Sequence, residues 1–220
     1  MLKLYHQPLS QNSRRVWILL LEKGLEFELV EMKIDGDQMQ PEFIALNPFH
    51  HIPVLVDDRF NVIESLAILD YLEAKYPTAM LPTDAKDLAT VRMVQMLTVN
   101  ELAPAMYPLI NRMMGFALVD DSQKLAEANQ KIATVLKFFE NLLSDKEYFG
   151  REKLSLGDIV AGCAVTLLPI LDFSLIDYPK IGKWCDILTQ RPAWQHTQPT
   201  LEAIEAFKEQ MKALMQQYGS

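Results

Sequence analysis

The chain has 220 residues, half of them hydrophobic, so it can bury a core in one large domain or two small ones. Lys and Arg total 21 against 29 Asp and Glu, and the formal net charge of −8 disfavours nucleic acid or an anionic membrane as a partner. No apolar run reaches the roughly 18 residues that span a bilayer, and the N-terminus lacks the apolar run of a signal peptide. We therefore expect a cytoplasmic protein.

The first third of the chain predicts a mixed α/β unit. Apolar periodicity and turn residues indicate strand, helix, strand, short helix, two hairpin strands and a helix, over 2–7, 11–24, 27–33, 40–48, 52–58, 59–63 and 65–77. Gly24 suits the residue that follows a helix, and Pro48 ends the short helix. The predicted order is β-α-β-α-β-β-α.

The rest of the chain reads as helical. Pro77, Pro82 and the weak periodicity around them predict a linker over 78–87, which divides a first domain, 1–77, from an all-helical domain, 88–220. Residues 86–116 predict one long helix, with Pro104 and Pro108 marking a kink or break. Four more helical patterns follow, at 121–143, 155–171, 180–192 and 200–219, and the second of these is apolar enough to be the buried central helix.

The two cysteines, Cys163 and Cys185, lie in apolar helical patterns and form no Cys-x-x-Cys pair. We expect both to be buried free thiols, and the sequence shows no sign of a metal site.

Two short motifs suggest a peptide site. In "NPFHHIPVLVDD", residues 47–58, Pro53 opens a strand, and a cis Ile52–Pro53 bond would leave the Ile52 backbone free to pair with an extended peptide. An ordinary trans proline at a strand start is the alternative. In "VIESLAILDYL", residues 62–72, Ser65 suits a helix N-cap. The helix end there would attract a carboxylate and Glu64 would accept from an ammonium, or the pair only caps the helix.

The order of these pieces resembles the cytosolic glutathione transferases over nearly the whole chain. "NPFHHIPVL" is similar to the family's Asn-Pro-x-x-x-(Val/Ile)-Pro-x-Leu stretch, and "ESLAILDYLEAKYP" to its Glu-Ser-x-Ala-Ile-x-x-Tyr-Leu segment. "LSLGDIVAG" resembles the box that opens the core helix of the second domain, with Ser155 and Asp158 capping each other's N–H groups. "RPAWQ" is also similar to the family. The chain resembles a serine-type, theta-, phi- or tau-like bacterial member.

The resemblance implies a thioredoxin-like first domain and a cis bond before Pro53. It implies that Ile52 pairs with the cysteinyl backbone of glutathione, and that Glu64 and Ser65 hold the γ-glutamyl end. His51 stands where Lys or Gln often reaches the glycyl carboxylate, although a surface His is an equal alternative. Gln38 stands near the place of a glycyl-binding His in some classes.

The segment "SQNSRRV", residues 10–16, suggests how a thiol would be activated. A glutathione thiol has a pKa of roughly 8.5, and lowering it by about two units requires nearly 3 kcal/mol of anion stabilisation. A helix N-terminus and a donated hydroxyl proton can supply this. In the serine-type pattern, counting back from Arg15-Val16 selects Ser10, with Ser13 and Tyr5 as alternates. The alternative is that Ser10 only caps the helix, as would suit a non-catalytic relative.

The reaction implied is transfer of the glutathione thiolate to hydrophobic electrophiles, as in detoxification. No cysteine lies between Tyr5 and Val16, which argues against thiol–disulfide exchange. An adaptable, methionine-rich set is the candidate electrophile pocket: Met106, Tyr107, Ile110, Met113 and Met114. The family is normally a homodimer, so glutathione, an electrophile and a second copy are the expected partners.

Two other functions stay open on the same scaffold. One is a non-catalytic or regulatory binding protein, such as a stringent-starvation-like partner or a ligand carrier. The other is a glutathione-dependent dehalogenase or isomerase, which uses the same site with another electrophile. The presence of Ser10, Ile52-Pro53 and Glu64-Ser65 together favours the transferase.

Overall fold

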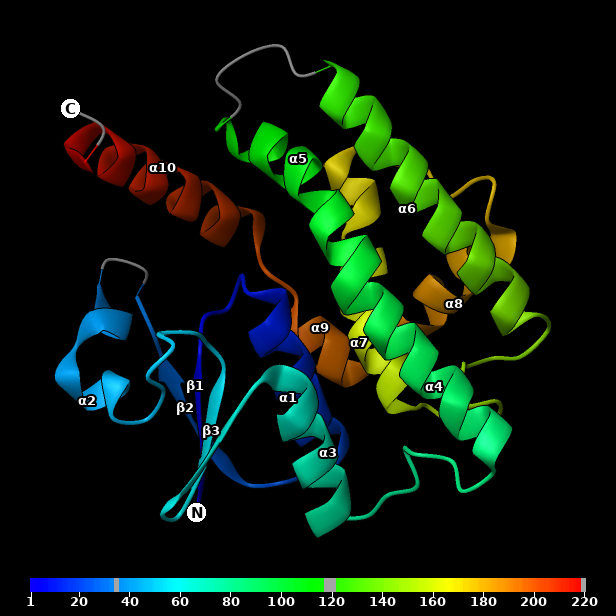
Figure 1. The fold of residues 1–220 in the computed structure, drawn as a ribbon, viewed down its shortest axis with the longest axis horizontal. Helices are drawn as coiled ribbons and strands as arrows, with labels where there is room; N and C mark the ends of the chain where they lie inside the picture. Colours follow the sequence, from blue (N-terminus) through cyan, green and yellow to red (C-terminus); the bar gives the residue numbers. More distant parts are fainter. Residues whose placement is uncertain (34–35, 117–121, 219–220) are drawn as a thin grey trace. The chain divides into compact units, whose positions relative to one another are not determined.

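The structure, a computed structural model, describes residues 1–33, 36–116 and 122–218, with side chains described up to Ala213 (Figure 1). Its contacts divide the chain into two compact units: Met1–Thr78 with Ala193–Ser220, and Ala79–Pro192. The first boundary lies close to the one drawn from sequence. The C-terminal segment differs, because the sequence division placed it in the helical domain and the structure groups it with the first unit.

The first unit is built on a four-stranded sheet with the strand order β2-β1-β3-β4. The strands are β1 (Leu2–His6), β2 (Phe27–Glu31), β3 (Val54–Asp57) and β4 (Phe60–Ile63). β1 runs parallel to β2 and antiparallel to β3, and β3 runs antiparallel to β4. This confirms the predicted mixed α/β unit: the parallel pair β1–β2 is joined by a helix, and the antiparallel pair β3–β4 is a hairpin.

Helices cover both faces of this sheet. α1 (Gln11–Glu22) and α3 (Ser65–Lys75) pack against each other and on the strands, and α2 (Pro41–Ile44) follows the short helix η1 (Asp37–Met39). Side chains alternate between faces along a strand. Phe43 of α2 therefore shares one face with Met32 and Val54, while Leu4 and Leu55 point to the other. Gly24 has a φ of 60° just after α1, as its predicted place requires.

The C-terminal segment of this unit is tied to α1 by Arg14. It contains α9 (Pro192–Thr197) and α10 (Leu201–Tyr218). The buried guanidinium donates to Thr197 Oγ1 at 3.3 Å, to the Trp194 carbonyl at 3.4 Å and to Gln198 Oε1 at 2.7 Å. A cation at the end of α9 complements the partial negative charge of that helix end.

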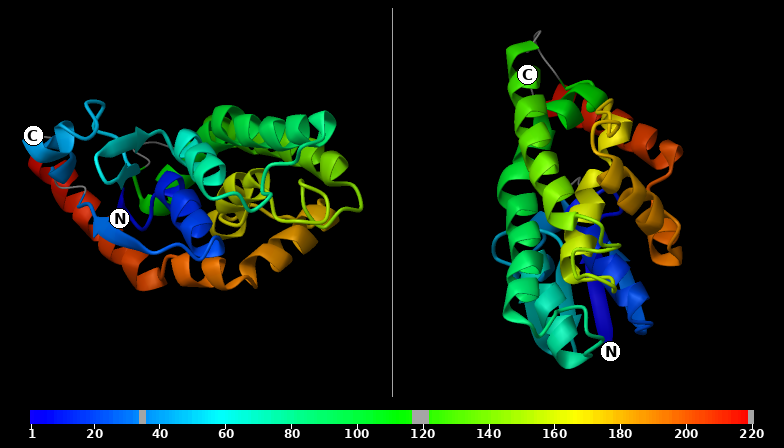
Figure 2. Two further views of the ribbon diagram at one scale, coloured as in Figure 1. Left: turned by 90° about the horizontal axis from the view of Figure 1, so that it is seen from below. Right: turned by 90° about the vertical axis from the view of Figure 1, so that its right-hand side faces the viewer.

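The second unit is helical (Figure 2). Its elements are α4 (Ala85–Leu97), the π-helical turn η2 (Thr98–Leu102), α5 (Ala103–Met114), α6 (Ser122–Leu143), α7 (Leu156–Val165), η3 (Leu168–Leu171) and α8 (Pro179–Thr189). Every residue of α7 is buried, which confirms the predicted central helix.

The long helix expected over 86–116 is divided at η2. The Ala103 N–H bonds to the carbonyl of Thr98, five residues back, instead of the usual four. Pro104, the next residue, has no N–H with which to continue the α-helical pattern, so the interruption precedes it. Pro108, in contrast, is accommodated inside α5.

Ser155 and Asp158 form the predicted capping box at the start of α7. Asp158 accepts from the Ser155 N–H at 2.9 Å and from Ser155 Oγ at 2.6 Å. It also accepts from the Phe149 N–H and from Trp184 Nε1, both at 2.9 Å. The box thus joins α7, α8 and the loop before α7.

Both cysteines are buried and neither forms a disulfide, as predicted. Burial raises the pKa of the Cys185 thiol to about 12, so this group stays protonated at neutral pH.

Candidate active site at one edge of the sheet

The candidate residues leave the sheet from the same edge. Tyr5, at the end of β1, pairs with Val30 near the end of β2 and with Val54 at the start of β3. Val54 in turn pairs with Ile63, the last residue of β4. Ser10 follows β1, Gln38 follows β2, and Glu64 and Ser65 follow β4, whereas Ile52 and Pro53 precede β3. The segments that contain these six candidate residues therefore all begin or end at this edge.

Ser10 is the N-cap of α1. Its φ and ψ of −75° and 116° are extended, and its Oγ accepts the Ser13 N–H at 3.3 Å. The N–H groups of Gln11 and Asn12 form no hydrogen bond within the described part of the chain. A half-buried hydroxyl thus lies beside two available N–H donors and the positive end of a 12-residue helix. Because Ser10 Oγ accepts from Ser13, its own proton remains available to a ligand.

The two alternates occupy different environments. Ser13 is fully buried, and its Oγ accepts the Gln7 N–H at 3.3 Å, so it holds the turn before α1. Tyr5 packs against the apolar cluster on the α2 face of the sheet, with its ring centroid 6.0 Å from that of Phe43. Neither residue has a half-buried hydroxyl at the N-cap of α1, as Ser10 does.

The Ile52–Pro53 peptide bond is cis, as the family resemblance implied. The N–H and C=O of Ile52 form no hydrogen bond with the described residues. Extended backbone with free polar groups beside a sheet can accept a peptide as an added strand.

The start of α3 differs from the sequence prediction. Glu64 holds the N-cap position and Ser65 is the first helical residue, so Ser65 is not the N-cap. Glu64 is exposed and has a φ of 66°, a left-handed value that is rare for a residue with a side chain. The N–H groups of Ser65, Leu66 and Ala67 form no hydrogen bond within the described residues. Glu64 thus combines a strained backbone with an exposed carboxylate beside an open helix N-terminus, a combination typical of functional sites.

His51 is exposed before the cis bond, and its carbonyl accepts from Asn47 Nδ2 at 2.7 Å. His50 Nδ1 lies 3.1 Å from the carbonyl of Gln38, which connects the β3 approach to η1. Gln38 itself is half-buried.

Asn47 is a residue whose role the sequence reading did not identify. It is buried, and besides its bond to His51 its Oδ1 accepts the Phe49 N–H at 3.0 Å. The side chain therefore shapes the loop that presents Ile52. An Asn directly before a proline was the available signal, because Asn side chains often bond to the backbone of a turn.

The side chains of the candidate electrophile pocket on α5 are unequally presented. Tyr107 is 60% exposed, and Ile110 and Met113 are half-buried. Met106 and Met114 are buried and support the helix from behind.

Among the described residues, no cluster of three or more His, Cys, Asp or Glu has a geometry that would hold a metal ion. Within the same part of the chain, no helix combines the length and apolarity needed to cross a bilayer.

Family models match both parts of the chain. The model for the N-terminal domain of glutathione S-transferases matches residues 4–80, and the model for their C-terminal domain matches residues 97–192. Together with the mixed four-stranded sheet and the helical second unit, they place the protein in the class with a thioredoxin-like first domain and an all-helical second domain.

Comparisons with individual proteins support the same assignment as the two family models. Glutathione S-transferase F10 of Arabidopsis thaliana is 32% identical over 202 residues, which cover 86% of this chain and 93% of the relative. Glutathione transferase F7 from Populus trichocarpa has a similar structure, with a TM-score of 0.79 at 28% identity over 90% of this chain and 97% of that one. A glutathione S-transferase-I bound with the ligand lactoylglutathione gives a TM-score of 0.80 at 26% identity, over 89% and 97%. The chain belongs to the glutathione S-transferase family.

Proposed function

We propose that this glutathione transferase joins the thiolate of glutathione to hydrophobic electrophiles, with Ser10 stabilising the thiolate. The observation that carries the assignment is the geometry of Ser10: a half-buried hydroxyl with an available proton at the open N-terminus of α1. A donated hydrogen bond and the helix end both favour the anion over the thiol. The thiol proton passes to solvent, the sulfur forms a bond to the electrophile, and the leaving group departs with its electron pair.

The rest of glutathione extends along the sheet edge in this proposal. Its cysteinyl backbone pairs with Ile52 beside Pro53, in the manner of an added strand. Its γ-glutamyl carboxylate binds the first turn of α3 at Ser65, and its ammonium is held by Glu64. Its glycyl end lies towards His51 and Gln38, which are brought near each other by the bond between His50 and the Gln38 carbonyl.

The electrophile site includes α5. Tyr107, Ile110 and Met113 present apolar surface for it, and the buried Met106 and Met114 hold that surface in place. Flexible thioether side chains adapt to ligands of varied shape, so we expect a broad range of hydrophobic electrophiles, consistent with a cytoplasmic detoxification role.

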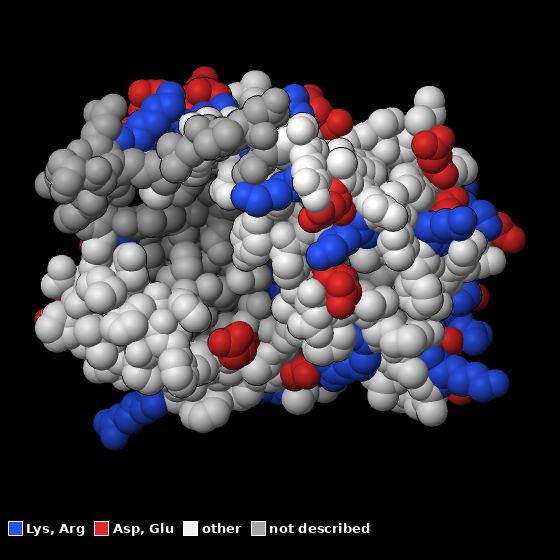
Figure 3. Space-filling view, turned by 45° about the horizontal axis from the view of Figure 1, so that its top comes forward, with Lys and Arg blue, Asp and Glu red and all other residues white. Residues whose placement is uncertain are grey.

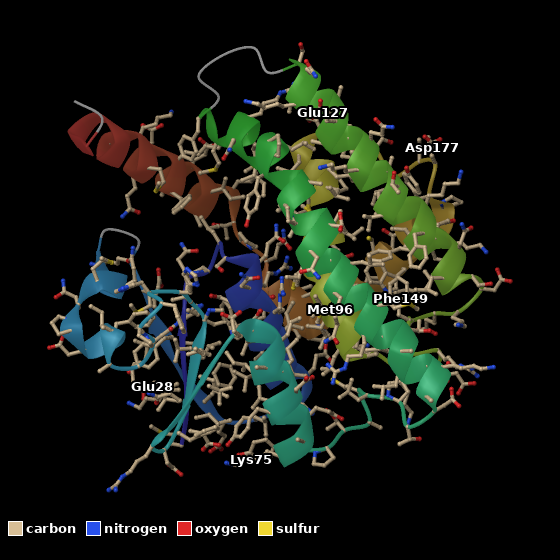
Figure 4. The ribbon with its side chains drawn as sticks, in the orientation of Figure 1. Glu28, Lys75, Met96, Glu127, Phe149 and Asp177 are labelled. Carbon is tan, nitrogen blue, oxygen red and sulfur yellow. The ribbon has the colours of Figure 1, made fainter. Side chains whose placement is uncertain are left out.

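A homodimer completes the proposal. A groove of about 660 Å³ runs between α4 and α6, with the exposed side chains of Met93, Met96 and Phe138 on it. Met96 is labelled on α4 in Figure 4. Exposed apolar grooves of this kind mark sites of protein contact, and an isologous contact would bury the groove of each copy.

On the face drawn in Figure 3, basic and acidic side chains are interspersed, a distribution that does not favour nucleic acid as a partner.

The experiment compares wild type with Ser10→Ala, in conjugation of glutathione to an aromatic chloride and in calorimetric binding of glutathione. We expect Ser10→Ala to bind glutathione with similar affinity but to lose about 10²-fold or more in kcat, as for loss of one stabilising donor. The pKa of the bound thiol, followed by thiolate absorbance, should rise in parallel. Unchanged turnover would overturn the role of Ser10. Glutathione binding without turnover of any halide or epoxide would instead favour the binding-protein reading, and turnover confined to halides or isomerisable substrates the dehalogenase or isomerase.

A further inference from the structure

Gln7 closes the turn that leads from β1 into α1. Its carbonyl accepts the Ser10 N–H at 3.0 Å, so residues 7–10 form a hydrogen-bonded turn. Its side-chain Oε1 accepts the Leu9 N–H at 2.6 Å, and the residue is only 9% exposed. The side chain of Gln7 therefore folds back over the turn that presents Ser10 and is held there.

The bond to Leu9 also fixes which way the Gln7 amide faces. Only the oxygen of a carboxamide accepts, so Oε1 must face the Leu9 N–H and the NH2 group must face another direction. Gln7 Nε2 forms no hydrogen bond within the described part of the chain. In contrast to the unpaired ring nitrogens of His6 and Trp17, it is not enclosed, so a ligand can reach it. Gln7 thus carries an oriented and accessible amide donor.

Other donors gather around this amide at the start of α1. Ser10 keeps its own hydroxyl proton available, and the N–H groups of Gln11 and Asn12 are free among the described residues. The Gln7 N–H donates to Ser13 Oγ at 3.3 Å, which ties Gln7 to the first turn of the helix. An anion at this place would accept from a charge-neutral amide as well as from the helix end, and hydrogen bonds to ionised acceptors are the stronger kind.

We propose that Gln7 is a further catalytic residue of the transferase, a second side-chain donor to the glutathione thiolate beside Ser10. Its amide N–H donates to the sulfur anion, and the thiol proton still passes to solvent. A donor that bonds to the anion alone lowers the pKa of the thiol, because it stabilises only the ionised form. This inference rests on the proposed function and adds to it a residue that activates the sulfur.

The test measures the pKa of the thiol of bound glutathione, followed by thiolate absorbance, in the full-length protein. Gln7→Met keeps the length of the side chain and removes the amide. We expect the thiol pKa to rise by about one unit or more, the size of one hydrogen bond to a charged group, and kcat at a pH below the wild-type pKa to fall about tenfold. An unchanged thiol pKa would overturn the inference.

S-methylglutathione is the matched ligand, because it has no thiol to ionise. Its calorimetric affinity should change by less than about twofold in Gln7→Met, since no hydrogen bond to an anion is lost. A loss of affinity for S-methylglutathione as large as the loss in kcat would show that the substitution damages the site as a whole, and it would refute a specific role on the sulfur.

A double-mutant cycle separates a second donor from a residue that only positions Ser10. The thiol pKa is compared for Gln7→Met, Ser10→Ala and the double variant. An independent donor should raise the pKa on either background, so the double variant should show nearly the sum of the two shifts. If Gln7 only holds the turn that places Ser10, its substitution adds nothing once the Ser10 hydroxyl is gone, and that result would refute the donor role.

Gln7→Glu provides a second variant should Gln7→Met not fold. It keeps an oxygen for the Leu9 N–H, so the turn is retained, and it replaces the NH2 donor by a negative oxygen. The thiol pKa should therefore rise more than in Gln7→Met. Gln195→Glu is the control, because it adds the same charge at an exposed position of α9, where solvent and salt screen it. Equal shifts in the two glutamate variants would again overturn the inference.

The proposed function and the role of Gln7 fail in different ways. If Ser10→Ala raises the thiol pKa and Gln7→Met does not, only the role of Gln7 is lost. If neither substitution changes the thiol pKa, or the wild type does not bind glutathione, the proposed function is contradicted and the role of Gln7 falls with it.

Discussion

Ser10 and Ser13 are three residues apart, yet the structure gives their hydroxyls different tasks. Ser10 Oγ caps α1 from a half-buried position, whereas Ser13 Oγ is buried and accepts the Gln7 N–H. The same residue type thus faces a ligand at one position and holds the chain at the other.

Ser13→Ala should therefore act on stability. It leaves the Gln7 N–H buried without its acceptor, which costs about 1–3 kcal/mol of the free energy of unfolding. Urea unfolding measures this loss, and conjugation kinetics of the folded variant should show kcat within about threefold of wild type. Ser10→Ala, which removes a cap, should cost about 1 kcal/mol and most of the turnover. A turnover loss in Ser13→Ala as large as that in Ser10→Ala would contradict this division.

His6, at the end of β1, makes the first unit sensitive to acid. Burial lowers the pKa of its imidazole from 6.5 to about 4, and its ring packs 5.1 Å from that of Trp17. The unfolded chain binds a proton at higher pH than the folded chain, so stability falls as pH falls from 6.5 to 4. The loss is bounded at about 3 kcal/mol.

His6→Phe should flatten this part of the stability curve, because phenylalanine keeps an aromatic ring and cannot titrate. Urea unfolding at a series of pH values between neutrality and pH 4 measures the slope for wild type and variant. Equal slopes would show that His6 is not responsible.

At the level of the helices, α7 depends on one carboxylate. Asp158 is buried and accepts four hydrogen bonds: from the Ser155 N–H and Oγ, the Phe149 N–H and Trp184 Nε1. An asparagine at this position would keep only one of the two acceptor oxygens, because its other terminal atom is an NH2 donor.

Asp158→Asn should accordingly lower the free energy of unfolding by about 1–3 kcal/mol, because the amide nitrogen faces the Ser155 N–H donor. Asp145→Asn is the control: its exposed carboxylate pairs with Lys180 at 3.3 Å, and the change should stay within about 0.5 kcal/mol. Thermal and urea unfolding of the two variants test the difference. Equal stabilities would show that the box contributes little.

At the level of the whole molecule, the groove between α4 and α6 bears on the proposed homodimer. Met96→Glu and Phe138→Glu place charges on exposed positions of this groove, so they should shift the protein to monomer without unfolding it. Sedimentation velocity measures the state. Ile176→Glu alters another exposed apolar residue, outside the groove, and should leave the dimer intact. Retention of the wild-type state by both groove variants would place the interface elsewhere.

The sequence predicted the elements well because their signals are local. Alternation marked the strands, Gly24 and Pro48 marked helix ends, and the box of Ser155 and Asp158 marked the start of α7. It predicted a kink or break of the long helix at Pro104 and Pro108, and the interruption, η2, lies just before Pro104, whereas Pro108 lies inside α5. It also assigned the N-cap of α3 to Ser65, although Glu64, the residue before it, holds that position, because either of two adjacent polar residues satisfies the local pattern.

By itself, then, the sequence determined the order of strands and helices, the division into a mixed unit and a helical unit, and the motifs of the candidate site. These follow from hydrophobic period, turn residues and short-range capping, which act over a few residues. The tertiary structure decided that α9 and α10 belong with the first unit, that Asn47 shapes the loop before Ile52, and that Arg15 reaches Ser65. Such partners are 4 to 183 residues apart, and a buried donor takes whichever acceptor packing brings to it, so only the folded chain identifies them.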